Sequence, residues 1–496
     1  MAGHGFRVSN RNRVKSLISL INSVFAYFVF QTVTDSGNNM TRRIQLTKEN
    51  ILNKIRFAGL FLEVHLSHLR MFAVGTLLKK RYVKGLFLLL IGCLLFSPDR
   101  LSAAEGKWFW NKVGEKVLVS RNSVATGDNF SPSVASSASR NTKDPLYLAV
   151  WAKQTLSGFD IFGARIDRDG KVLGEGDGEI SICSAANDQM YPVVVWNGEH
   201  FLVMWQDHRS GKRWEIYWAR VTPDGVVEDP DGKLLSKSSY DRGSPNVAWS
   251  GSRYLLAWQE KRGARAWNIY CMDLAKDLDT GGEQPRPVSF SLKDQVSPAV
   301  DFDGKNFMVV WQQKGKGNNW NIYGARIMPD QEPQDAETIQ INDSMSPAGS
   351  WMPVLSWNGE SYLILWTGSG GKDTWYVYGR RVSADGEFLD PADVPIQTGG
   401  ANKAFPALLW DGNQHLMIWE EDPGNYLGIY GASVDPKNWE FSSDAKLITS
   451  GQSEEKASFP ALSIISNEVL VLWQGKDEEG RWQIFGQKLV KMFIGS

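Results

Sequence analysis

Cysteine and histidine are scarce in this chain of 496 residues, which has three of the first and six of the second. Cys93 falls in an apolar N-terminal segment, which leaves Cys183 and Cys271 far apart in the remainder. Two distant thiols make neither a disulfide framework nor a zinc site, and scattered histidines do not make a metal centre. We therefore expect no metal and no cofactor.

Motifs of several enzyme classes are also missing. The sequence holds no glycine-rich phosphate loop, no nucleophile elbow and no sialidase-type Asp box of the form Ser-x-Asp-x-Gly-x-Thr-Trp. A basic stripe is missing too, because residues 105–496 carry 39 Lys and Arg against 51 Asp and Glu. A net charge of −12 over this part argues against a nucleic-acid partner.

The N-terminal part has a different composition, with 15 basic and 4 acidic residues in residues 1–104 and all 21 tryptophans beyond them. A basic cluster at residues 79–81 precedes the apolar run Leu86–Phe96, and small residues follow as far as Ala104. Eleven apolar residues are too few for an ordinary membrane-spanning helix. The pattern predicts a signal peptide over residues 71–104 and an exported, periplasmic or extracellular protein. The alternative is a lipid anchor on Cys93.

Residues 1–70 precede this signal, although a signal peptide normally begins the chain. Met71 stands eight residues before Lys79, so our hypothesis is that residues 1–70 are a non-native upstream extension. The rival interpretation is a membrane segment over residues 17–33, which are apolar and follow three basic residues. We expect contact with a membrane only through the signal peptide, a lipid on Cys93 or this upstream helix.

A five-residue apolar run that ends in tryptophan returns seven times, at intervals of 53 to 55 residues. A fixed period of this length is typical of solenoids and propellers. Each run is bounded by polar turns, as in a strand buried on both faces. The seven runs are Tyr147–Trp151, Phe201–Trp205, Tyr254–Trp258, Phe307–Trp311, Tyr362–Trp366, His415–Trp419 and Val469–Trp473.

Each run is the second strand, b, of a repeat that opens with a proline. In repeats two to seven the proline stands 13 residues before the tryptophan, and apolar residues alternate after it, which predicts strand a. Asn-Gly or Asp-Gly turns follow in several repeats and favour a hairpin. Strand c, of the Ile-Tyr-Gly type, comes after strand b, and a weaker strand d closes the repeat. Four strands in each of seven repeats predict an all-β, seven-bladed β-propeller over residues 105–490, followed by a tail over residues 491–496.

The seventh repeat has no strand d of its own. Residues 116–120 form an orphan apolar strand before the first proline. We expect this strand to complete the last blade, which closes the ring and removes two exposed sheet edges.

The stretch from Pro192 to Gly225 resembles the repeats of TolB-type and related bacterial propellers. It shares the order of proline, strand, glycine turn, apolar strand, a loop that reads Asp207-His-Arg209-Ser-Gly211, Ile-Tyr and a second glycine turn. The resemblance covers the core of each repeat but not strand d, and the repeats here are longer. It implies a protein of the bacterial envelope that binds other proteins, mostly without catalysis.

Four carboxylates stand four residues before a proline, in the first four repeats. In a propeller the d–a and b–c loops share one face, so these side chains would lie at that end of the blades. Such carboxylates could serve as acid and base in a glycosidase. The structural interpretation, which repetition at equivalent positions favours, is that they shape the turn by accepting backbone amides. The residues are Asp128, Asp188, Asp241 and Asp294.

Trp351, Arg209, Arg242 and Arg262 are the predicted ligand contacts on the same face. The alignment of the repeats places them on d–a or b–c loops, and aromatic and Arg side chains are frequent anchors of binding sites. Trp351 has no evident counterpart in the other repeats. We expect a non-enzymatic propeller that binds a protein or glycan on this face. The alternative is a carbohydrate-active enzyme that uses the four Asp residues.

Overall fold

The computed structural model describes residues 107–120, 127–138, 143–176, 178–262, 266–278, 284–317, 319–328, 338–343, 349–371, 374–396, 401–439, 445–452 and 456–494. Every regular element in these ranges is a β-strand, and within them no helix is long and apolar enough to cross a membrane. The predictions for residues 1–104, including the signal peptide, Cys93 and the segment 17–33, lie outside the described residues.

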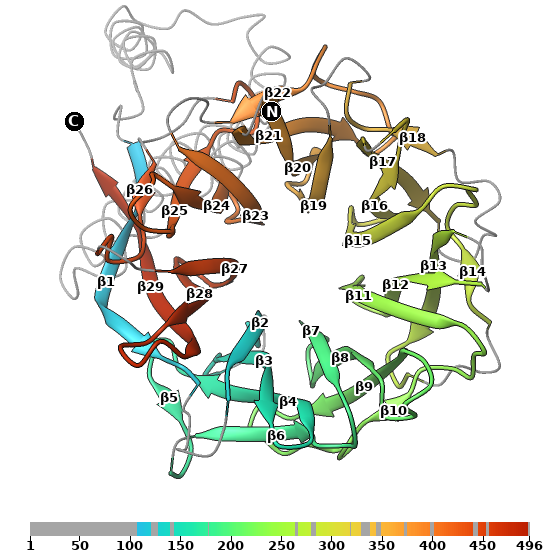
Figure 1. Cartoon of the computed structure of the whole chain (residues 1–496). Helices are drawn as coiled ribbons and strands as arrows, with labels where there is room; N and C mark the ends of the chain where they lie inside the picture. Colours follow the sequence, from blue (N-terminus) through green and yellow to red (C-terminus); the bar gives the residue numbers. More distant parts are fainter. Residues whose placement is uncertain are drawn as a thin grey trace, which may run out of the picture. The chain divides into compact units, whose positions relative to one another are not determined.

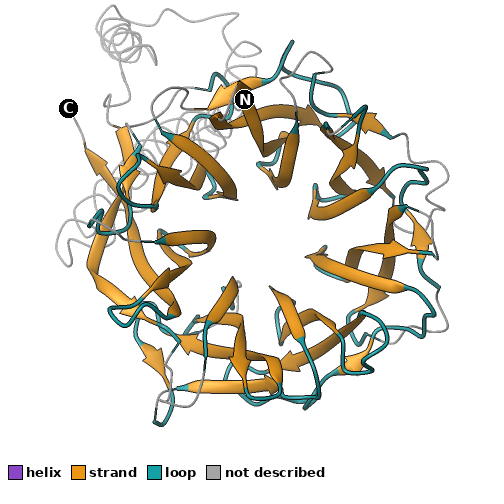
Figure 2. Ribbon diagram, in the orientation of Figure 1, coloured by secondary structure: helices purple, strands orange, loops and turns teal. Residues whose placement is uncertain are grey.

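Seven antiparallel sheets form a ring, with the first strand of each blade next to the ring axis (Figure 1). Figure 2 shows the same ring built from strands joined by loops. This confirms the predicted seven-bladed propeller. Blade 1 contains β2 (Asn129–Ser136), β3 (Tyr147–Thr155), β4 (Gly158–Ile166), β5 (Val172–Leu173) and β6 (Glu179–Cys183); blade 2 contains β7 (Gln189–Trp196), β8 (Phe201–Asp207), β9 (Glu215–Val221) and β10 (Lys233–Leu234).

The remaining blades repeat the four-stranded pattern. They are blade 3 with β11 (Asp241–Trp249), β12 (Arg253–Lys261), β13 (Trp267–Ala275) and β14 (Arg286–Pro287); blade 4 with β15 (Gln295–Phe302), β16 (Phe307–Lys314), β17 (Trp320–Ile327) and β18 (Ile339–Gln340); blade 5 with β19 (Ser350–Trp357), β20 (Ser361–Gly371), β21 (Thr374–Ser383) and β22 (Val394–Ile396); blade 6 with β23 (Asn402–Trp410), β24 (His415–Asp422), β25 (Gly428–Val434) and β26 (Lys446–Leu447); and blade 7 with β27 (Ala457–Ile465), β28 (Glu468–Lys476), β29 (Trp482–Ile494) and the N-terminal β1 (Lys107–Leu118).

The second strand of each blade forms its core. The closing tryptophan of every five-residue run is at most 1% exposed, and apolar residues from neighbouring blades pack around it. In blade 4, Trp311 stacks on Tyr323 with ring centroids 6.4 Å apart. Each core therefore lies between two sheets, as the nearly continuous apolar runs predict.

A β-bulge interrupts the first strand of every blade. The pairing with the second strand shifts around the proline, and the residue before each proline has a φ of 48° to 55°. A non-glycine residue in this region is uncommon and strained, so its sevenfold recurrence marks a fixed feature of the repeat. The residues are Ser131, Tyr191, Ser244, Ser297, Met352, Phe405 and Phe459.

The N-terminal strand closes the ring. β1 pairs antiparallel with β29 from Lys107↔Ile494 to Leu118↔Phe485, with one irregularity between Val113 and Val117. The predicted closure is confirmed, although β1 begins nine residues earlier than expected. Trp110 joins the core between blades 6 and 7, and Val119 joins the core between blades 7 and 1. The outer strands of blades 2 to 6 are only two or three residues long.

Candidate functional site

The candidate site is the end of the blades that carries the d–a and b–c loops, where the sequence placed all eight candidate residues. Two sets of side chains define its geometry. The first set joins five of the blades to the preceding blade through four Asp side chains and Asn402. The second set joins five pairs of neighbouring blades through the residue that follows the core tryptophan.

The four candidate catalytic carboxylates each accept a backbone amide from the preceding blade. Asp128 Oδ1 accepts the Trp482 amide at 2.8 Å, and Asp188 Oδ1 accepts the Phe159 amide at 3.1 Å. Asp241 and Asp294 accept the amides of Trp214 and Trp267 at 3.0 and 3.1 Å. Asn402 accepts the Trp375 amide at 3.0 Å in the same way. We call these contacts the staples.

The staples explain why these carboxylates are present without any catalytic role. A neutral amide replaces the carboxylate in Asn402, and Gly349 stands at the equivalent position of blade 5. Acid–base catalysis on a glycoside requires two carboxyl groups in unlike surroundings. Four Asp residues with the same kind of partner do not supply that difference.

Carboxyl groups with a raised pKa occur elsewhere on the inner half of the blades. Burial raises the pKa of Glu420 to about 7. Burial also raises the pKa of Asp301 to about 6, although part of this residue remains exposed. Glu420 pairs with Ala404 in the first half of β23, whereas Asp301 lies next to the last residue of β15, in a blade that is not adjacent. They therefore do not form the acid and base of one site.

The predicted ligand contacts Arg209 and Arg262 do lie on b–c loops, where each is tied to a buried acid. In blade 2 the Trp205 indole donates to Asp207 Oδ2 at 2.8 Å, and Arg209 Nη2 donates to the same oxygen at 2.7 Å. The Arg209 guanidinium also lies 3.7 Å from the centroid of the Tyr217 ring. These contacts hold Arg209 in one position and leave its side chain 22% exposed.

Blade 3 repeats this arrangement with one addition. Arg262 Nε donates to Glu260 Oε1 at 2.7 Å and Arg242 Nε donates to Glu260 Oε2 at 2.8 Å. Arg242 lies in β11 and is 3% exposed, so its predicted position on a loop is wrong. Removal of either Arg242 or Glu260 would leave a buried charge uncompensated and would destabilise the fold.

Trp351 also lies in a strand rather than on a loop. It is the second residue of β19, and its ring meets Trp375 edge to face with centroids 4.8 Å apart. It stands two residues before a proline, as Phe130 does in blade 1, where Phe130 contacts Phe159 and Trp482. The expectation that Trp351 has no counterpart is therefore wrong.

An exposed apolar surface, of which the sequence predicted only Trp351 as a ligand contact, lies at this end of blades 5 to 7. Met352 is 40% exposed, Phe459 is 37% exposed, and the rings of Phe405 and Phe459 are 4.5 Å apart across the boundary between two blades. Trp375 is 38% exposed. Blades 1, 3 and 4 carry serine where blades 5 to 7 carry Met352, Phe405 and Phe459. We call Trp351, Met352, Trp375, Phe405 and Phe459 the apolar crescent. Three of its members, Met352, Phe405 and Phe459, could have been found from the sequence, because each stands directly before the proline of its repeat.

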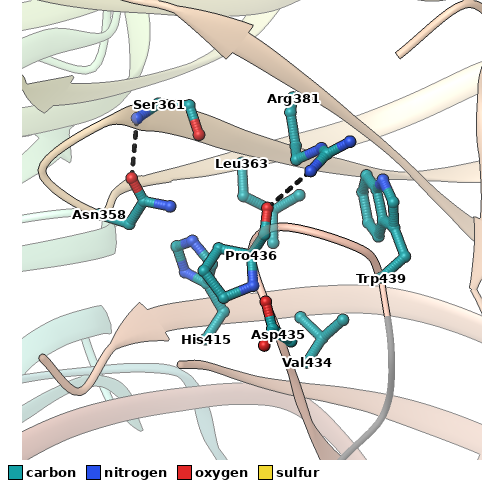
Figure 3. A pocket seen from close by; sticks show the side chains of 9 residues that line it. All are labelled: Asn358, Ser361, Leu363, Arg381, His415, Val434, Asp435, Pro436 and Trp439. Carbon is teal, nitrogen blue, oxygen red and sulfur yellow. Dashed lines mark hydrogen bonds between the residues drawn. The ribbon is translucent and has the colours of Figure 1, made fainter. Parts of the chain in front are cut away.

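Two cavities lie away from this end of the blades. The first has no room for a water molecule and lies between blades 5 and 6 near their a–b hairpins (Figure 3). Its lining residues are Asn358, Ser361, Leu363, Arg381, His415, Val434, Asp435, Pro436 and Trp439. The second has a volume of about 70 Å³ and lies between β1, blade 6 and β29. Among the described residues, no group of three or more His, Cys, Asp or Glu side chains could hold a metal ion.

His415 lines the first cavity. It is fully buried, and neither ring nitrogen has a hydrogen-bond partner among the described residues. Other blades have Tyr147 or Tyr362 at this position, and those hydroxyls donate to the carbonyl oxygens of Glu468 and Asn306 in the preceding blade. Histidine is too short for this contact.

The substitution His415→Tyr is expected to stabilise the protein, most strongly at acidic pH. Burial lowers the pKa of His415 to about 4, so the native state stays neutral while the unfolded chain binds a proton below about pH 6.5. The stability that the neutral histidine contributes is present above pH 6.5 and is lost as the pH falls towards 4, by about 2 kcal/mol at pH 5. Urea unfolding at pH 5 and pH 8 measures this difference. His415→Phe is the control, because it removes the titration without adding a hydroxyl, and an equal gain at both pH values would contradict the expectation.

Comparisons with known proteins establish no family. No family model matches the chain, and no curated protein matches it. The resemblance to TolB-type propellers therefore stays a prediction. Among solved structures, a protein of unknown function from Dyadobacter fermentans is 13% identical, with a TM-score of 0.44 over 77% of this chain and 99% of that one.

Two enzymes are also among the structural matches. An α-L-arabinofuranosidase from Lactobacillus brevis is 13% identical, with a TM-score of 0.36 over 54% of this chain and 95% of that one. A sialidase from Trypanosoma rangeli is 10% identical, with a TM-score of 0.39 over 64% of this chain and 56% of that one. Likeness at this level carries no argument about activity.

Proposed function

We propose that the protein is an exported, non-enzymatic binding protein that holds a protein or glycan ligand on the face with the d–a and b–c loops. The observation that carries this proposal is the apolar crescent. Exposed aromatic and apolar side chains from three adjacent blades gather there, and a binding site concentrates its energy in a few such residues. The Asp residues on the same face each accept a backbone amide from the preceding blade.

The arginines take a supporting part in this proposal. Arg209 and Arg262 present partly exposed guanidinium groups on b–c loops, fixed by Asp207 and Glu260. A preorganised cation at the rim orients a ligand at little cost in entropy. Arg242 holds Glu260 from inside and has no surface for a ligand.

Replacing Trp351 and Phe459 by Ala together is expected to weaken binding at least tenfold and to leave the melting temperature nearly unchanged, because both side chains are partly exposed. Ligands would come from a pull-down on bacterial envelope extract and from a glycan array, with residues 105–496 as bait. The matched control is Val226→Ala with Leu389→Ala, which removes exposed apolar side chains near the c–d hairpins on the opposite face.

Two results would overturn the proposal. Loss of binding in the control pair but not in the first pair would place the ligand on the opposite face. A glycosidase activity of the wild-type protein that Asp188→Asn or Asp241→Asn abolishes, without loss of folding, would establish an enzyme.

A further inference from the structure

The b–c loops of blades 2 to 4 carry an excess of positive charge. Residues 208–214, 261–267 and 314–320 hold three, three and two Lys and Arg residues and no Asp or Glu. The corresponding loops of blades 6 and 7 carry the acids Asp422, Asp477, Glu478 and Glu479. Blades 2 to 4 lie next to one another on the ring (Figure 1). The acidic excess of residues 105–496 therefore conceals a local cationic surface on the face that carries these loops.

Four lysines on these loops have no carboxylate partner. Lys212 and Lys316 are exposed, and Lys261 and Lys314 are partly exposed. None of the four forms an ion pair with another residue that the structure describes. An unpaired cation keeps its full attraction for an anionic ligand, because no acid of the protein neutralises it.

Each of the three loops ends in a tryptophan, and in two blades a lysine pairs with it across the hairpin. Lys261 and Trp267 are cross-strand partners in β12 and β13, and Lys261 Nζ lies 5.9 Å from the centroid of the indole. Lys314 and Trp320 are the equivalent partners in blade 4. Trp214 takes this position in blade 2. Adjacent blades therefore repeat the combination of an aromatic ring and a cation.

These tryptophans are not core residues. Trp214, Trp267 and Trp320 are all partly exposed, and none of them belongs to the apolar clusters that the blades bury between them. An exposed indole offers a flat apolar surface. The C–H face of a sugar ring matches such a surface, so the three rings can serve as stacking platforms.

Two arginines add cations that aromatic rings hold in place. The Arg209 guanidinium lies over Tyr217, and the Arg262 guanidinium lies 5.1 Å from the Tyr240 centroid and 4.3 Å from the Tyr270 centroid. Arg262 donates from Nε to its buried acid, and its two terminal nitrogens have no acceptor among the described residues. A stacked guanidinium keeps its edge available for a carboxylate or sulfate group.

We propose that the b–c loops of blades 2 to 4 bind an acidic polysaccharide. Its sugar rings stack on Trp214, Trp267 and Trp320, and its carboxylate or sulfate groups contact the neighbouring lysines and arginines. The inference rests on the proposed function, because it names the class of ligand that the same face holds. The recurrence of one platform and its cations on successive blades fits a polymer with recurring charged units.

Other polyanions match this surface less well. Duplex DNA carries one charge per about 1.7 Å of its axis. The net charge of −12 on residues 105–496 opposes so dense a polyanion. An acidic polypeptide carries its carboxylates on flexible chains and offers no sugar ring to the tryptophans. An acidic polysaccharide combines spaced anionic groups with rings that stack.

Titration of the full chain with alginate and with dextran sulfate, followed by tryptophan fluorescence, tests the proposal. All 21 tryptophans lie beyond residue 104, so a polymer bound to the basic N-terminal part does not stack on one. We expect both polymers to change the emission at low salt, with an affinity that falls as salt is added. Their uncharged counterparts, propylene glycol alginate and dextran, should have no effect. No change with either acidic polymer would overturn the proposal.

The double variant Lys261→Gln with Lys314→Gln is expected to bind both acidic polymers about tenfold more weakly, because it loses the cations beside two platforms. The matched control is Lys171→Gln with Lys305→Gln, which removes the same charge from exposed lysines on hairpins of the opposite face. The control should keep the affinity of the wild-type protein. An equal loss in both variants would show that net charge alone governs binding and would overturn the site.

Two further results separate this inference from the proposed function. If poly-glutamate or a thymidine oligonucleotide binds more tightly than both polysaccharides and the lysine pair weakens that binding, the class of ligand is wrong. If neither polysaccharide binds but Trp351→Ala with Phe459→Ala still weakens a captured partner, this inference fails and the proposed function stands. If the lysine pair weakens polysaccharide binding and the crescent pair affects no partner, the crescent fails and the site on blades 2 to 4 stands.

Discussion

Deletion of residues 105–121 is expected to lower the melting temperature by on the order of 10 °C or to make the protein aggregate. The deletion removes β1, which pairs with β29 over most of its length and contributes Trp110 and Val119 to two cores. Each kcal/mol of lost stability lowers the melting temperature of a medium-sized domain by about 2–4 °C, so a loss of several kcal/mol gives a fall of this size. The bare edge of β29 would also be free to pair with another chain. Calorimetry and size-exclusion chromatography measure the two effects.

Glu115→Ala is the control for this deletion. Glu115 lies in the irregular part of β1 between Val113 and Val117, and its side chain is exposed. Its replacement should leave both the melting temperature and the monomeric state unchanged. A deletion variant that stays monomeric and as stable as the wild-type protein would refute the role of β1 in holding the ring closed.

Trp311→Ala is expected to reduce the free energy of unfolding by about 3–5 kcal/mol, because it empties the space of a fully buried indole in a packed core. Denaturant unfolding at neutral pH measures the loss. A near-neutral result would mean that the core of blade 4 does not depend on its central side chain.

The comparison of Trp311→Phe with Trp205→Phe separates packing from hydrogen bonding. The Trp311 indole nitrogen is buried without a partner among the described residues, so phenylalanine removes no hydrogen bond there. The Trp205 indole donates to the buried Asp207, so the same change leaves a carboxylate with one donor fewer. We expect Trp205→Phe to cost more than Trp311→Phe, and the reverse order would contradict this account of the two cores.

The fold was predictable because the repeat period and the alternation of strand a are local properties of the sequence. The seven runs that end in tryptophan became the central strands, and the orphan strand before the first proline became part of β1. The start of β1 at Lys107 was not predictable, because the length of β29, about 370 residues away in sequence, determines it. The outer strands, of two or three residues each, are too short to show an alternation of apolar and polar residues.

The candidate site was predictable only in part, because its details depend on contacts between blades. Arg242 looked like an exposed anchor, but a partner 18 residues away, Glu260, draws it into the interior. The positive φ of Tyr191, Met352 and Phe405 could not be predicted from the sequence, because residues of these types rarely adopt it.

Two kinds of side-chain contact hold the junctions between blades: the staples, and the clamps, in which the residue after a core tryptophan accepts the amide of the residue before the next blade's proline, as Gln312 does for Met352. The junction between blades 1 and 2 has Ala152 where the other blades have Gln, Thr or Glu, so this residue cannot form a clamp, but Asp188 supplies its staple. The junction between blades 4 and 5 has Gly349 in place of a staple, but Gln312 supplies its clamp. Between blades 6 and 7, where Lys456 stands at the staple position, the Ala457 amide donates to the Leu427 carbonyl oxygen. The residue that makes one of these contacts can therefore change at a given junction while the other contact is kept. Such a ring can change its surface one blade at a time without opening.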